Sequence, residues 1–447
     1  MNNLKVGFSR ANINPPMGIA IRGYYKPRFA EAILDDLQVN AIAIQSGDVK
    51  TLLITVDHCG IEQNLSAVFR KAASDAAGVP EENIIIHATH SHTAAELMLD
   101  SENELTKEYT TFVERRIADV AKFAVEDLKA AKMGFGKGTA PNVAFIRRYV
   151  MKDGSIKTNP GVNNPDIVRP VGDIDDSVNV LRFDREGAET VVFVNFANHP
   201  DVVGGCKISA DWPGLLRTNV EKILDNTKCI FVNGAQGDIN HVNVHPKGGD
   251  LNNMFMDFDD VSRGYNHAEY IARVVTGGVL QAYDKVNYVD VDSICSKQIV
   301  VNVPSNRPDP KDIPEAHRIN DLHNAGKDSE LPYEGMMLTT VVAEAARMVR
   351  LENGPDAFDM RLSAMAIGPV AIIGIPGEPF SGVGKGLKET EGFEMILPCC
   401  LSNGSQGYFP MQDSYDEGGY EARSSRFKAG VAEFIIDEGQ KLLKSIK

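Results

Sequence analysis

The sequence contains few cysteines, and they form no pattern that binds metal or builds disulfide bonds. Six cysteines occur in 447 residues, and no two of them are spaced as Cys-x-x-Cys. So few cysteines in so long a chain exclude a disulfide framework, and a structural zinc site ligated by cysteine is not expected. We expect each cysteine to be a small, buried, apolar side chain.

Long apolar runs and basic charge are also scarce. No stretch approaches the about 20 apolar residues of a transmembrane helix, and residues 1–6 lack the apolar segment of a signal peptide. The formal net charge is -15, from 46 Lys and Arg against 61 Asp and Glu. This balance argues against nucleic acid or an anionic membrane as the main partner, because either favours a basic surface. We therefore expect a cytoplasmic protein without a membrane anchor, whose oligomeric state the sequence leaves open.

The chain shows no internal repeat, no low-complexity tract and no sharp change of composition. Its 43% apolar and 24% charged residues are ordinary for a soluble globular protein. Length alone allows two or three domains, or one large one. We expect a single domain over residues 1–447, with a weak break near residues 305–313.

Short β-rich runs alternate with amphipathic helical patterns along the chain. This alternation predicts an α/β fold, with a mixed β-sheet core flanked by helices. Turn residues dominate residues 149–172 and 246–265, and loops of this length tend to be lids or binding loops. We expect strands at residues 39–44, 51–56, 83–87, 190–196, 229–233, 289–294 and 370–375, and helices at residues 65–77, 106–131, 212–224, 267–283, 337–351 and 426–444.

Two histidines follow an apolar run that predicts a buried strand, where residues 84–93 read IIIHATHSHT. Side chains alternate along a strand, so His90 and His92 share a face if the extended backbone continues. Two imidazoles on one face supply half of a metal site, and catalytic zinc usually takes three protein ligands plus water. The alternative is that both are loop residues that hydrogen-bond to the backbone.

A third histidine and a glutamate follow two other apolar runs. His199 comes after VVFVNF at residues 191–196, and Pro200 favours extended backbone there. Glu378 comes after IIGI at residues 372–375. Functional sites collect at the carboxyl ends of strands in α/β proteins, and these side chains make up the nitrogen and oxygen ligand set of a catalytic zinc. Taken singly, each could instead be a capped turn or a solvated loop residue.

These motifs, in this order, resemble the catalytic domain of the neutral, non-lysosomal ceramidases. The motifs are ATHSH at residues 88–92, NHP at 198–200, GDIN at 237–240 and PGE at 376–378, followed by a pair of tyrosines near the C-terminus. The resemblance covers most of the chain, from residue 7 to residue 421. It implies a ceramidase-like hydrolase with one zinc ion per chain.

The resemblance implies zinc ligands at His90, His199, Glu378 and Tyr408. The tyrosine follows from the resemblance alone, because metal chemistry by itself does not predict it. Asp57, at the end of another apolar run, could orient a ligand imidazole. Capping a turn at the strand end is an equally good interpretation of Asp57.

The resemblance also implies three catalytic residues. His92 is expected to be the acid/base residue beside the metal and to pass a proton to the leaving nitrogen. Arg147, with its neighbour Arg148 as an alternative, and Tyr420 are expected to donate hydrogen bonds where negative charge develops. Zinc would polarise the carbonyl and lower the pKa of a bound water from 15.7 to about 7.

Several features depart from the ceramidase pattern. Ceramidases carry a serine where this chain has Asn240, which is a poor nucleophile but can orient substrate through its amide. The sequence ends soon after the expected helix at 426–444, so the additional C-terminal β-sandwich domain of ceramidases is not expected. No amphipathic membrane-binding stretch with a basic face is found. We therefore expect a smaller, soluble substrate; His241 and His245 either contact it or are solvated loop residues.

Three functions remain open at this point. The leading hypothesis is zinc-dependent hydrolysis of a carboxamide C–N bond in a small-molecule amide. The second is hydrolysis of an ester, lactone or phosphoester, because Lewis-acid activation serves all of these bonds. The third is a non-catalytic metal-binding protein on the same fold, since fold alone does not establish function.

Overall fold

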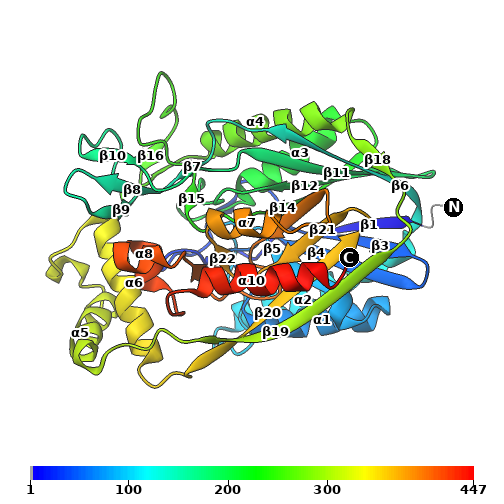
Figure 1. The fold of residues 1–447 in the computed structure, drawn as a ribbon. Helices are drawn as coiled ribbons and strands as arrows, with labels where there is room; N and C mark the ends of the chain where they lie inside the picture. Colours follow the sequence, from blue (N-terminus) through cyan, green and yellow to red (C-terminus); the bar gives the residue numbers. More distant parts are fainter. Residues whose placement is uncertain (1–3) are drawn as a thin grey trace.

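Two β-sheets form the centre of the molecule in the computed structural model, which describes residues 4–447 (Figure 1). In spatial order, the main path of the nine-stranded sheet contains β14 (Thr227–Asn233), β12 (Thr190–Phe196), β11 (Ser177–Arg185), β6 (Lys129–Thr139), β1 (Lys5–Asn12), β3 (Gln38–Ser46), β4 (Val49–Val56) and β5 (Ile84–Ala88), and β18 (Asn287–Val289) pairs with β6. The four-stranded sheet contains β19 (Ile294–Pro304), β20 (Ala357–Ile367), β21 (Val370–Gly374) and β23 (Met395–Cys399). The pairs β4–β5, β12–β14 and β21–β23 are parallel, and the other pairs in these sheets are antiparallel. The predicted α/β fold with a mixed sheet core is confirmed.

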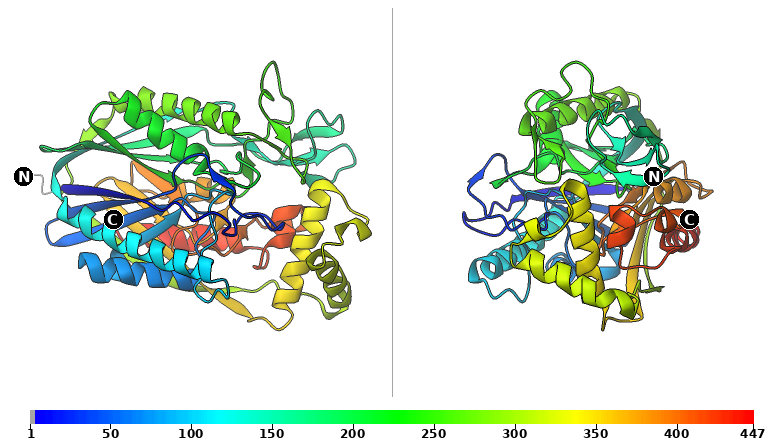
Figure 2. Two further views of the ribbon diagram at one scale, coloured as in Figure 1. Left: turned by 180° about the vertical axis from the view of Figure 1, so that it is seen from behind. Right: turned by 90° about the vertical axis from the view of Figure 1, so that its left-hand side faces the viewer.

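Pairs of helices cover the sheets (Figures 1 and 2). Helices α1 (Gln63–Ala77) and α2 (Glu104–Glu126) pack on β3, β4 and β5, whereas α3 (Asp211–Ile223) and α4 (Tyr265–Tyr283) pack on β11, β12 and β14. Helices α7 (Ser381–Lys388) and α10 (Val431–Lys444) cover the four-stranded sheet. The Asn103 side chain begins α2 by accepting the N–H groups of Leu105 and Thr106, which would otherwise have no partner.

Successive side chains of β12 point alternately into two different apolar cores. Val192 and Val194 belong to the apolar core under α3 and α4. Val191 and Phe193, which point to the other face, belong to the core between the large sheet and the four-stranded sheet. A strand that is buried on both faces is apolar throughout, which explains why its sequence is a continuous β-branched run.

A helical hairpin lies at one end of the molecule. Helices α5 (Ile313–Asn324) and α6 (Gly335–Leu351) pack together, and α6 also packs on α9 (Tyr420–Ser424) (Figure 2). The remaining elements are β2 (Ala32–Ile33), β7 (Phe145–Ile146), β8 (Arg148–Met151), β9 (Ile156–Thr158), β10 (Ile167–Pro170), β13 (Lys207–Ile208), β15 (Ile239–Asn240), β16 (Phe255–Met256), β17 (Ser262–Arg263), β22 (Glu378–Pro379), β24 (Tyr408–Phe409), α8 (Asp413–Glu417) and the short 3-10 helices η1 (Glu81–Asn83), η2 (Pro310–Asp312) and η3 (Asp328–Glu330). Segment 305–313 joins β19 to α5; the single domain over 1–447 stays a prediction.

Most of the predicted helices and strands are present, and the errors lie at the residues where these elements begin or end. The predicted helix 106–131 is too long, because α2 ends at Glu126 and residues from 129 onward form β6. The predicted strand 289–294 spans the break between β18 and β19, and residues 426–430 precede α10. Strands β1, β6, β11, β19 and β20 and helices α5 and α7 were not predicted.

The glycines in β6 interrupt the sequence pattern by which a strand is predicted. Gly138 lies on the face of β6 that α4 covers, and a Cβ placed there would come 1.9 Å from the carbonyl oxygen of Gly278. Glycine therefore allows close approach of helix and strand, although it lowers the β-propensity of the segment. The partner of β6 is β11, far along the chain, so pairing and not local preference makes this segment a strand.

The two turn-rich regions contain more structure than predicted. Within residues 149–172, β8, β9 and β10 form a small three-stranded sheet. Residues 246–265 contain only the β16–β17 pair before α4 begins. Among residues 4–447, no helix is long and apolar enough to cross a membrane.

The six cysteines are free, as the lack of a disulfide pattern predicted. Four of them are buried: Cys59, Cys229, Cys399 and Cys400. The expectation of burial is wrong for the other two, because Cys206 is half-buried and Cys295 is exposed.

A buried ion pair ties α3 to the opposite half of the large sheet. The Arg217 guanidinium on α3 donates to both carboxylate oxygens of Asp57, which follows β4, and Nη1 lies 2.9 Å from Oδ1. The two side chains are 2% and 0% exposed. The Asp57 carboxylate also accepts the Thr89 hydroxyl and the backbone N–H of Gln38. Asp57 contacts no imidazole, so the interpretation that it orients a ligand histidine is wrong.

Replacing Arg217 with Met would leave the Asp57 carboxylate buried without its cation. Breaking a buried pair from one side costs about 3–5 kcal/mol, so we expect the free energy of unfolding in urea to fall by that amount. The exposed Arg116→Met variant on α2 is the control, since surface substitutions usually stay within about 0.5 kcal/mol. An equal effect of the two variants would show that the buried pair does not hold α3 in place.

Candidate metal centre

The carboxyl ends of three parallel strand pairs meet at the candidate site. His87 in β5 connects them: its Nδ1 lies 2.7 Å from the carbonyl oxygen of Cys400, and its Nε2 accepts the backbone N–H of Asn233 at 3.0 Å. The N–H of Cys400 in turn donates to the carbonyl oxygen of Asn233 at 3.1 Å. Burial lowers the pKa of His87 to about 3, so its neutral ring can accept one hydrogen bond and donate the other. The ends of β5, β14 and β23 are thereby held together.

Two histidines and one carboxylate converge just beyond these strand ends. The Nε2 atoms of His90 and His199 each lie 3.3 Å from Oε2 of Glu378. The two imidazole centroids are 4.6 Å apart, and all three side chains are buried. Their donor atoms lie within 4.8 Å of one another, which is compatible with ligands of a single ion.

Backbone carbonyls orient both imidazoles. Nδ1 of His90 lies within hydrogen-bond distance of the carbonyl oxygen of Cys59, and Nδ1 of His199 lies 2.9 Å from that of Ile239. An Nδ1–H that donates to a carbonyl leaves the lone pair of Nε2 pointing toward Glu378. The carbonyls therefore select the tautomer that a metal requires.

His90 does not continue the strand, contrary to the prediction. β5 ends at Ala88, and His90 has a φ of 81°, in the left-handed region that a residue other than glycine rarely adopts. His90 and His92 therefore do not share a strand face. Their rings nevertheless meet, with centroids 4.6 Å apart, an interplanar angle of 85° and an Nε2 to Nε2 distance of 3.2 Å.

The charges of this cluster suit a cation. Burial opposes ionisation of Glu378, but His90 and His199 hold its pKa well below the usual value. Burial and the Arg147 guanidinium lower the pKa of His199 to about 3. Oε2 of Glu378 is buried without a hydrogen-bond donor. A buried anionic oxygen between two imidazole nitrogens is stabilised by a metal ion or by a proton shared with an imidazole.

Tyr408 is brought beside Glu378 by a short parallel pairing. β22 and β24 pair with Glu378 opposite Tyr408. Burial and then Glu378 raise the pKa of Tyr408 well above its usual value. The Arg147 guanidinium lies 5.3 Å from the centroid of the Tyr408 ring.

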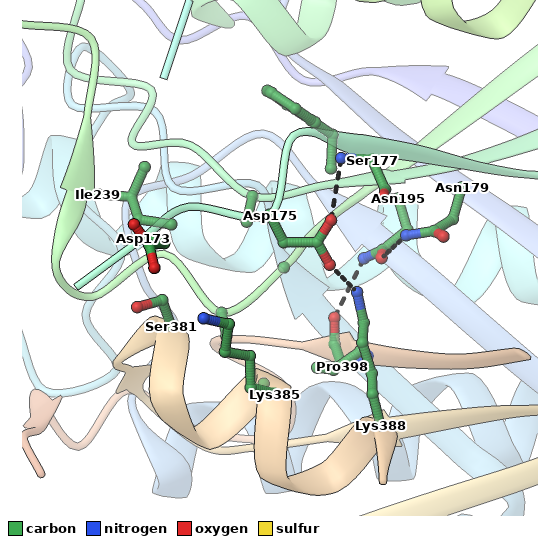
Figure 3. A pocket seen from close by; sticks show the side chains of 15 residues that line it. Asp173, Asp175, Ser177, Asn179, Asn195, Ile239, Ser381, Lys385, Lys388 and Pro398 are labelled. Atoms are coloured by element: carbon green, nitrogen blue, oxygen red, sulfur yellow. Dashed lines mark hydrogen bonds and ion pairs between the residues drawn. The ribbon is translucent and has the colours of Figure 1, made fainter. Parts of the chain in front are cut away.

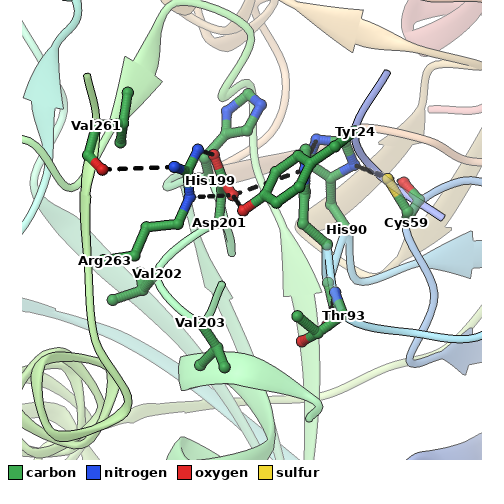
Figure 4. A network of polar contacts seen from close by, with 12 residues as sticks. Tyr24, Cys59, His90, Thr93, His199, Asp201, Val202, Val203, Val261 and Arg263 are labelled. Carbon is green, nitrogen blue, oxygen red and sulfur yellow. Dashed lines mark hydrogen bonds and ion pairs between the residues drawn. The ribbon is translucent and has the colours of Figure 1, made fainter. Parts of the chain in front are cut away.

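A carboxylate that the sequence did not point to faces His92. Nδ1 of His92 lies 3.8 Å from Oδ1 of Asp201. Asp201 also accepts the Tyr24 hydroxyl and both Nε and Nη2 of Arg263 (Figure 4). Burial opposes ionisation of Asp201, but Arg263 and His92 lower its pKa. The Asp201 carboxylate is therefore a fixed negative charge on the Nδ1 side of the His92 ring.

Arg147 is locked in place, whereas Arg148 points elsewhere. Nε of Arg147 donates to Oε1 of Glu421 at 2.6 Å, and Nη2 donates to the carbonyl oxygen of Gly237 at 2.8 Å. Its Nη1 lies 3.5 Å from Nε2 of His199. Arg148 instead binds Glu417. The structure thus brings Arg147 to the cluster and leaves the alternative outside it.

Tyr420 and Asn240 complete the set of predicted residues. The ring of Tyr420 packs edge-on against Tyr408, with centroids 5.5 Å apart. Burial and the neighbouring Tyr25 raise the pKa of Tyr420 well above its usual value, so its hydroxyl is a neutral donor. Nδ2 of Asn240 donates to Oδ1 of Asn159 at 2.9 Å.

All the predicted residues line two adjoining cavities. A cavity of about 290 Å³ is lined by His90, His92, Glu378, Tyr408 and Tyr420, among others. A second, of about 60 Å³, shares His92, Tyr408 and Tyr420 and adds Arg147, His199 and Asn240. The shared side chains place both cavities at the same centre.

A smaller cavity lies away from this centre, beside α7 (Figure 3). It has about 30 Å³, and Asp175 and Lys388 form an ion pair of 2.6 Å on its wall. None of the predicted ligands or catalytic residues lines it. Its lining contains no histidine, so the ligand set of the candidate centre has no counterpart there.

Two loop histidines do not belong to the candidate centre. His241 is buried, with Nε2 2.6 Å from the carbonyl oxygen of Ser262, so the interpretation of a solvated residue is wrong for it. His245 is exposed. The sequence analysis missed Cys59 and Glu421, which bind His90 and Arg147, and Asp201, which faces His92. No spacing relative to the histidine motifs identifies them.

No protein-family model matches the chain, and no curated protein matches it in sequence. Solved ceramidase structures do share its fold. The neutral ceramidase from Pseudomonas aeruginosa matches with a TM-score of 0.73 at 16% sequence identity, over 100% of this chain and 75% of that chain. A ceramidase structure described as complexed with C2 gives a TM-score of 0.72 at 16% identity, over 100% of this chain and 76% of that one. The chain therefore has a neutral ceramidase-like α/β fold, the resemblance that its motifs predicted.

Proposed function

We propose that this protein is a zinc-dependent hydrolase that cleaves the carboxamide C–N bond of a small-molecule substrate. The observation that carries the proposal is the buried, donorless Oε2 of Glu378, held 3.3 Å from the Nε2 atoms of two histidines. The ceramidase-like fold supports an amide as the bond that is cleaved. Two imidazoles and a carboxylate, with an open position beside them, are typical of catalytic zinc.

His90, His199 and Glu378 would hold the ion, and Tyr408, which pairs opposite Glu378, would be its fourth ligand. Zinc bound there supplies Lewis acidity, which polarises a carbonyl group and acidifies water. With Nε2 deprotonated, the rings of His90 and His199 would offer lone pairs, and the Glu378 carboxylate would offer the negative charge that balances the cation.

His92 has the position of an acid/base residue. Its Nε2 lies 3.2 Å from Nε2 of His90, and its Nδ1 faces Asp201 on the opposite side. The Asp201 carboxylate would be a charge partner for the ring while it carries a proton. His92 can then accept a proton from water and deliver it to the leaving nitrogen.

Arg147 and Tyr420 have the positions of donors to a developing oxyanion. Arg147 is immobilised by Glu421 and Gly237, so it needs no reorganisation during the reaction. Tyr420 keeps its proton because burial raises its pKa. Both line the cavity that contains His92 and Asn240, where Asn240 would orient the substrate.

Ester or lactone hydrolysis is the second candidate, since the same donors would stabilise the same type of oxyanion. A non-catalytic metal-binding role is less well supported, because it gives no function to His92, Arg147 and Tyr420 around the cavity. The second group of potential ligands, Cys59 with His90 and His92, shares His90 with the first. It would therefore compete for the same ion and does not suggest a two-metal phosphoesterase. The cytoplasmic location stays a prediction.

The ligand set can be tested by metal binding alone. We expect the wild-type chain to bind one Zn²⁺, and His90→Ala and Glu378→Gln to weaken binding by more than about 100-fold, since even losing a group that only orients a ligand costs about 10–100-fold. Cys59→Ala should keep the ion, and so should the control His317→Ala, far along the chain on α5. Mass spectrometry of metal content and titration with a zinc indicator measure both. Metal lost from Cys59→Ala but kept by Glu378→Gln would assign the ion to the other group.

The role of His92 can be tested by separating metal binding from turnover. Loss of a positioned acid/base group lowers the rate by about 10²–10⁴-fold, so His92→Ala should keep its zinc and lose kcat by that factor. Release of amine from a panel of N-acyl amides measures turnover, with His317→Ala as the matched control. Full activity of His92→Ala would refute the assigned role.

A further inference from the structure

Three arginines line the larger of the two cavities at the candidate metal centre. Arg22 precedes the tyrosines Tyr24 and Tyr25, Arg350 lies in the last turn of α6, and Arg426 lies between α9 and α10. They come from distant parts of the sequence, and the cavity they share has about 290 Å³. The same cavity is lined by His90, His92 and Glu378.

The positive charge of these arginines is not balanced within the cavity wall. Arg22 donates to Glu62 at 2.5 Å. In the chain from residue 4 to residue 447, neither Arg350 nor Arg426 forms an ion pair with a carboxylate. Burial and then Arg350 lower the pKa of Arg426, whereas Glu62, which already pairs with Arg22, raises it.

The cavity wall is also unsuited to a hydrocarbon chain. Besides the arginines, it carries Glu62, Gln406 and Ser405 near the metal centre. Burying an unpaired guanidinium against an acyl chain would cost free energy, because the charge would lose its water without gaining a partner. A carboxylate or phosphate would instead gain charge-assisted, bidentate hydrogen bonds.

We propose that the substrate carries an anionic oxygen group, a carboxylate or a phosphate, which binds between Arg350 and Arg426 while its amide lies at the candidate metal centre. The position of the amide rests on the proposed function, whereas the anion site depends only on the arginines. Tyr420 stands between this cavity and the smaller one with Arg147 and Asn240, so the part of the substrate beyond the amide extends past Tyr420. The uncharged amide of a ceramide would leave both arginines unsatisfied.

Binding of a simple anion tests the site without requiring catalysis. Isothermal titration with succinate, and separately with inorganic phosphate, is compared for the wild type, Arg350→Gln/Arg426→Gln, His90→Ala and the exposed control Arg116→Gln. Hydrogen bonds to charged groups are worth about 10–100-fold in binding, so we expect the double variant to lose succinate or phosphate affinity by at least that factor. The control Arg116→Gln should bind as the wild type does, and His90→Ala should keep the binding that depends on the arginines. If the double Gln variant does not fold, Arg350→Lys/Arg426→Lys keeps the charge and should bind more weakly through loss of the bidentate geometry.

Three results would overturn the anion site. They are no binding of either anion to the wild type, equal binding by the wild type and the arginine variants, and binding that is lost in His90→Ala but kept in the arginine variants. The last would mean that the anion binds the metal. The two probes also distinguish a carboxylate site from a phosphate site, because the preferred anion shows the larger loss in the arginine variants.

Hydrolysis of matched substrates then separates this proposal from the proposed function. N-acetyl amino acids are compared with their uncharged amides, and succinyl anilides with butyryl anilides, so that the charge lies on either side of the scissile bond. We expect a higher kcat/KM for the anionic member of one pair, and loss of that preference in the arginine variants. Arginine-dependent succinate or phosphate binding without hydrolysis of any amide would refute the hydrolase and keep the anion site. Hydrolysis without a preference for charge would refute the anionic substrate alone.

Discussion

His87 makes the hydrogen bonds on which the geometry of the centre depends. Its neutral ring joins the end of β5 to Asn233 in β14 and to Cys400 after β23. Strands β5 and β14 lie at opposite ends of the main path of the large sheet, and β23 belongs to the four-stranded sheet. The chain segments that leave this junction carry the candidate ligands. His90 follows β5, and Glu378 follows β21, the parallel partner of β23. A charged ring at position 87 would lose its acceptor role, so the low pKa of this buried histidine is a condition for the assembly of the site.

Around the centre, nearly every buried charge has a protein partner of opposite sign. Arg147 is paired with Glu421, and Asp201 is paired with Arg263. Glu378 is different, because only imidazoles face its Oε2. Burial of this oxygen without a cation is costly, and either the metal ion of the proposed function or a proton shared with an imidazole would offset that cost.

The sequence predicted the candidate ligands that follow apolar strands, and it failed where long-range packing decides the structure. His90, His199 and Glu378 were predictable because β-branched runs mark the strands and sites collect at their carboxyl ends. Tyr408 came from the resemblance alone; it is placed by the pairing of two-residue strands, which have no periodicity to detect. The left-handed backbone of His90 was also beyond prediction, since it is imposed by the contacts of the folded chain.

The partners that hold the catalytic groups were missed for the same reason. Asp201 lies in the sequence directly after Pro200, yet nothing local shows that it faces His92 and Arg263. Asp57 looked like a better candidate because it follows a strand, but its carboxylate binds Arg217 instead. The local sequence pattern shows which side chains lie at strand ends. The partner that each of these side chains binds depends on the helix that covers its strand end.

Asn240 narrows the chemistry that the centre can perform. Its Oδ1 accepts the N–H of Val242 at 3.0 Å, and its Nδ2 donates to Asn159, so the carboxamide is held rigidly and faces the cavity beside Arg147. An amide nitrogen is a poor nucleophile, and one that is engaged in a hydrogen bond is poorer still. No covalent intermediate can therefore form at the position where ceramidases carry a serine. In the proposed reaction the attacking atom must come from water, with His92 as the group placed to take its proton, and Asn240 can only orient the substrate.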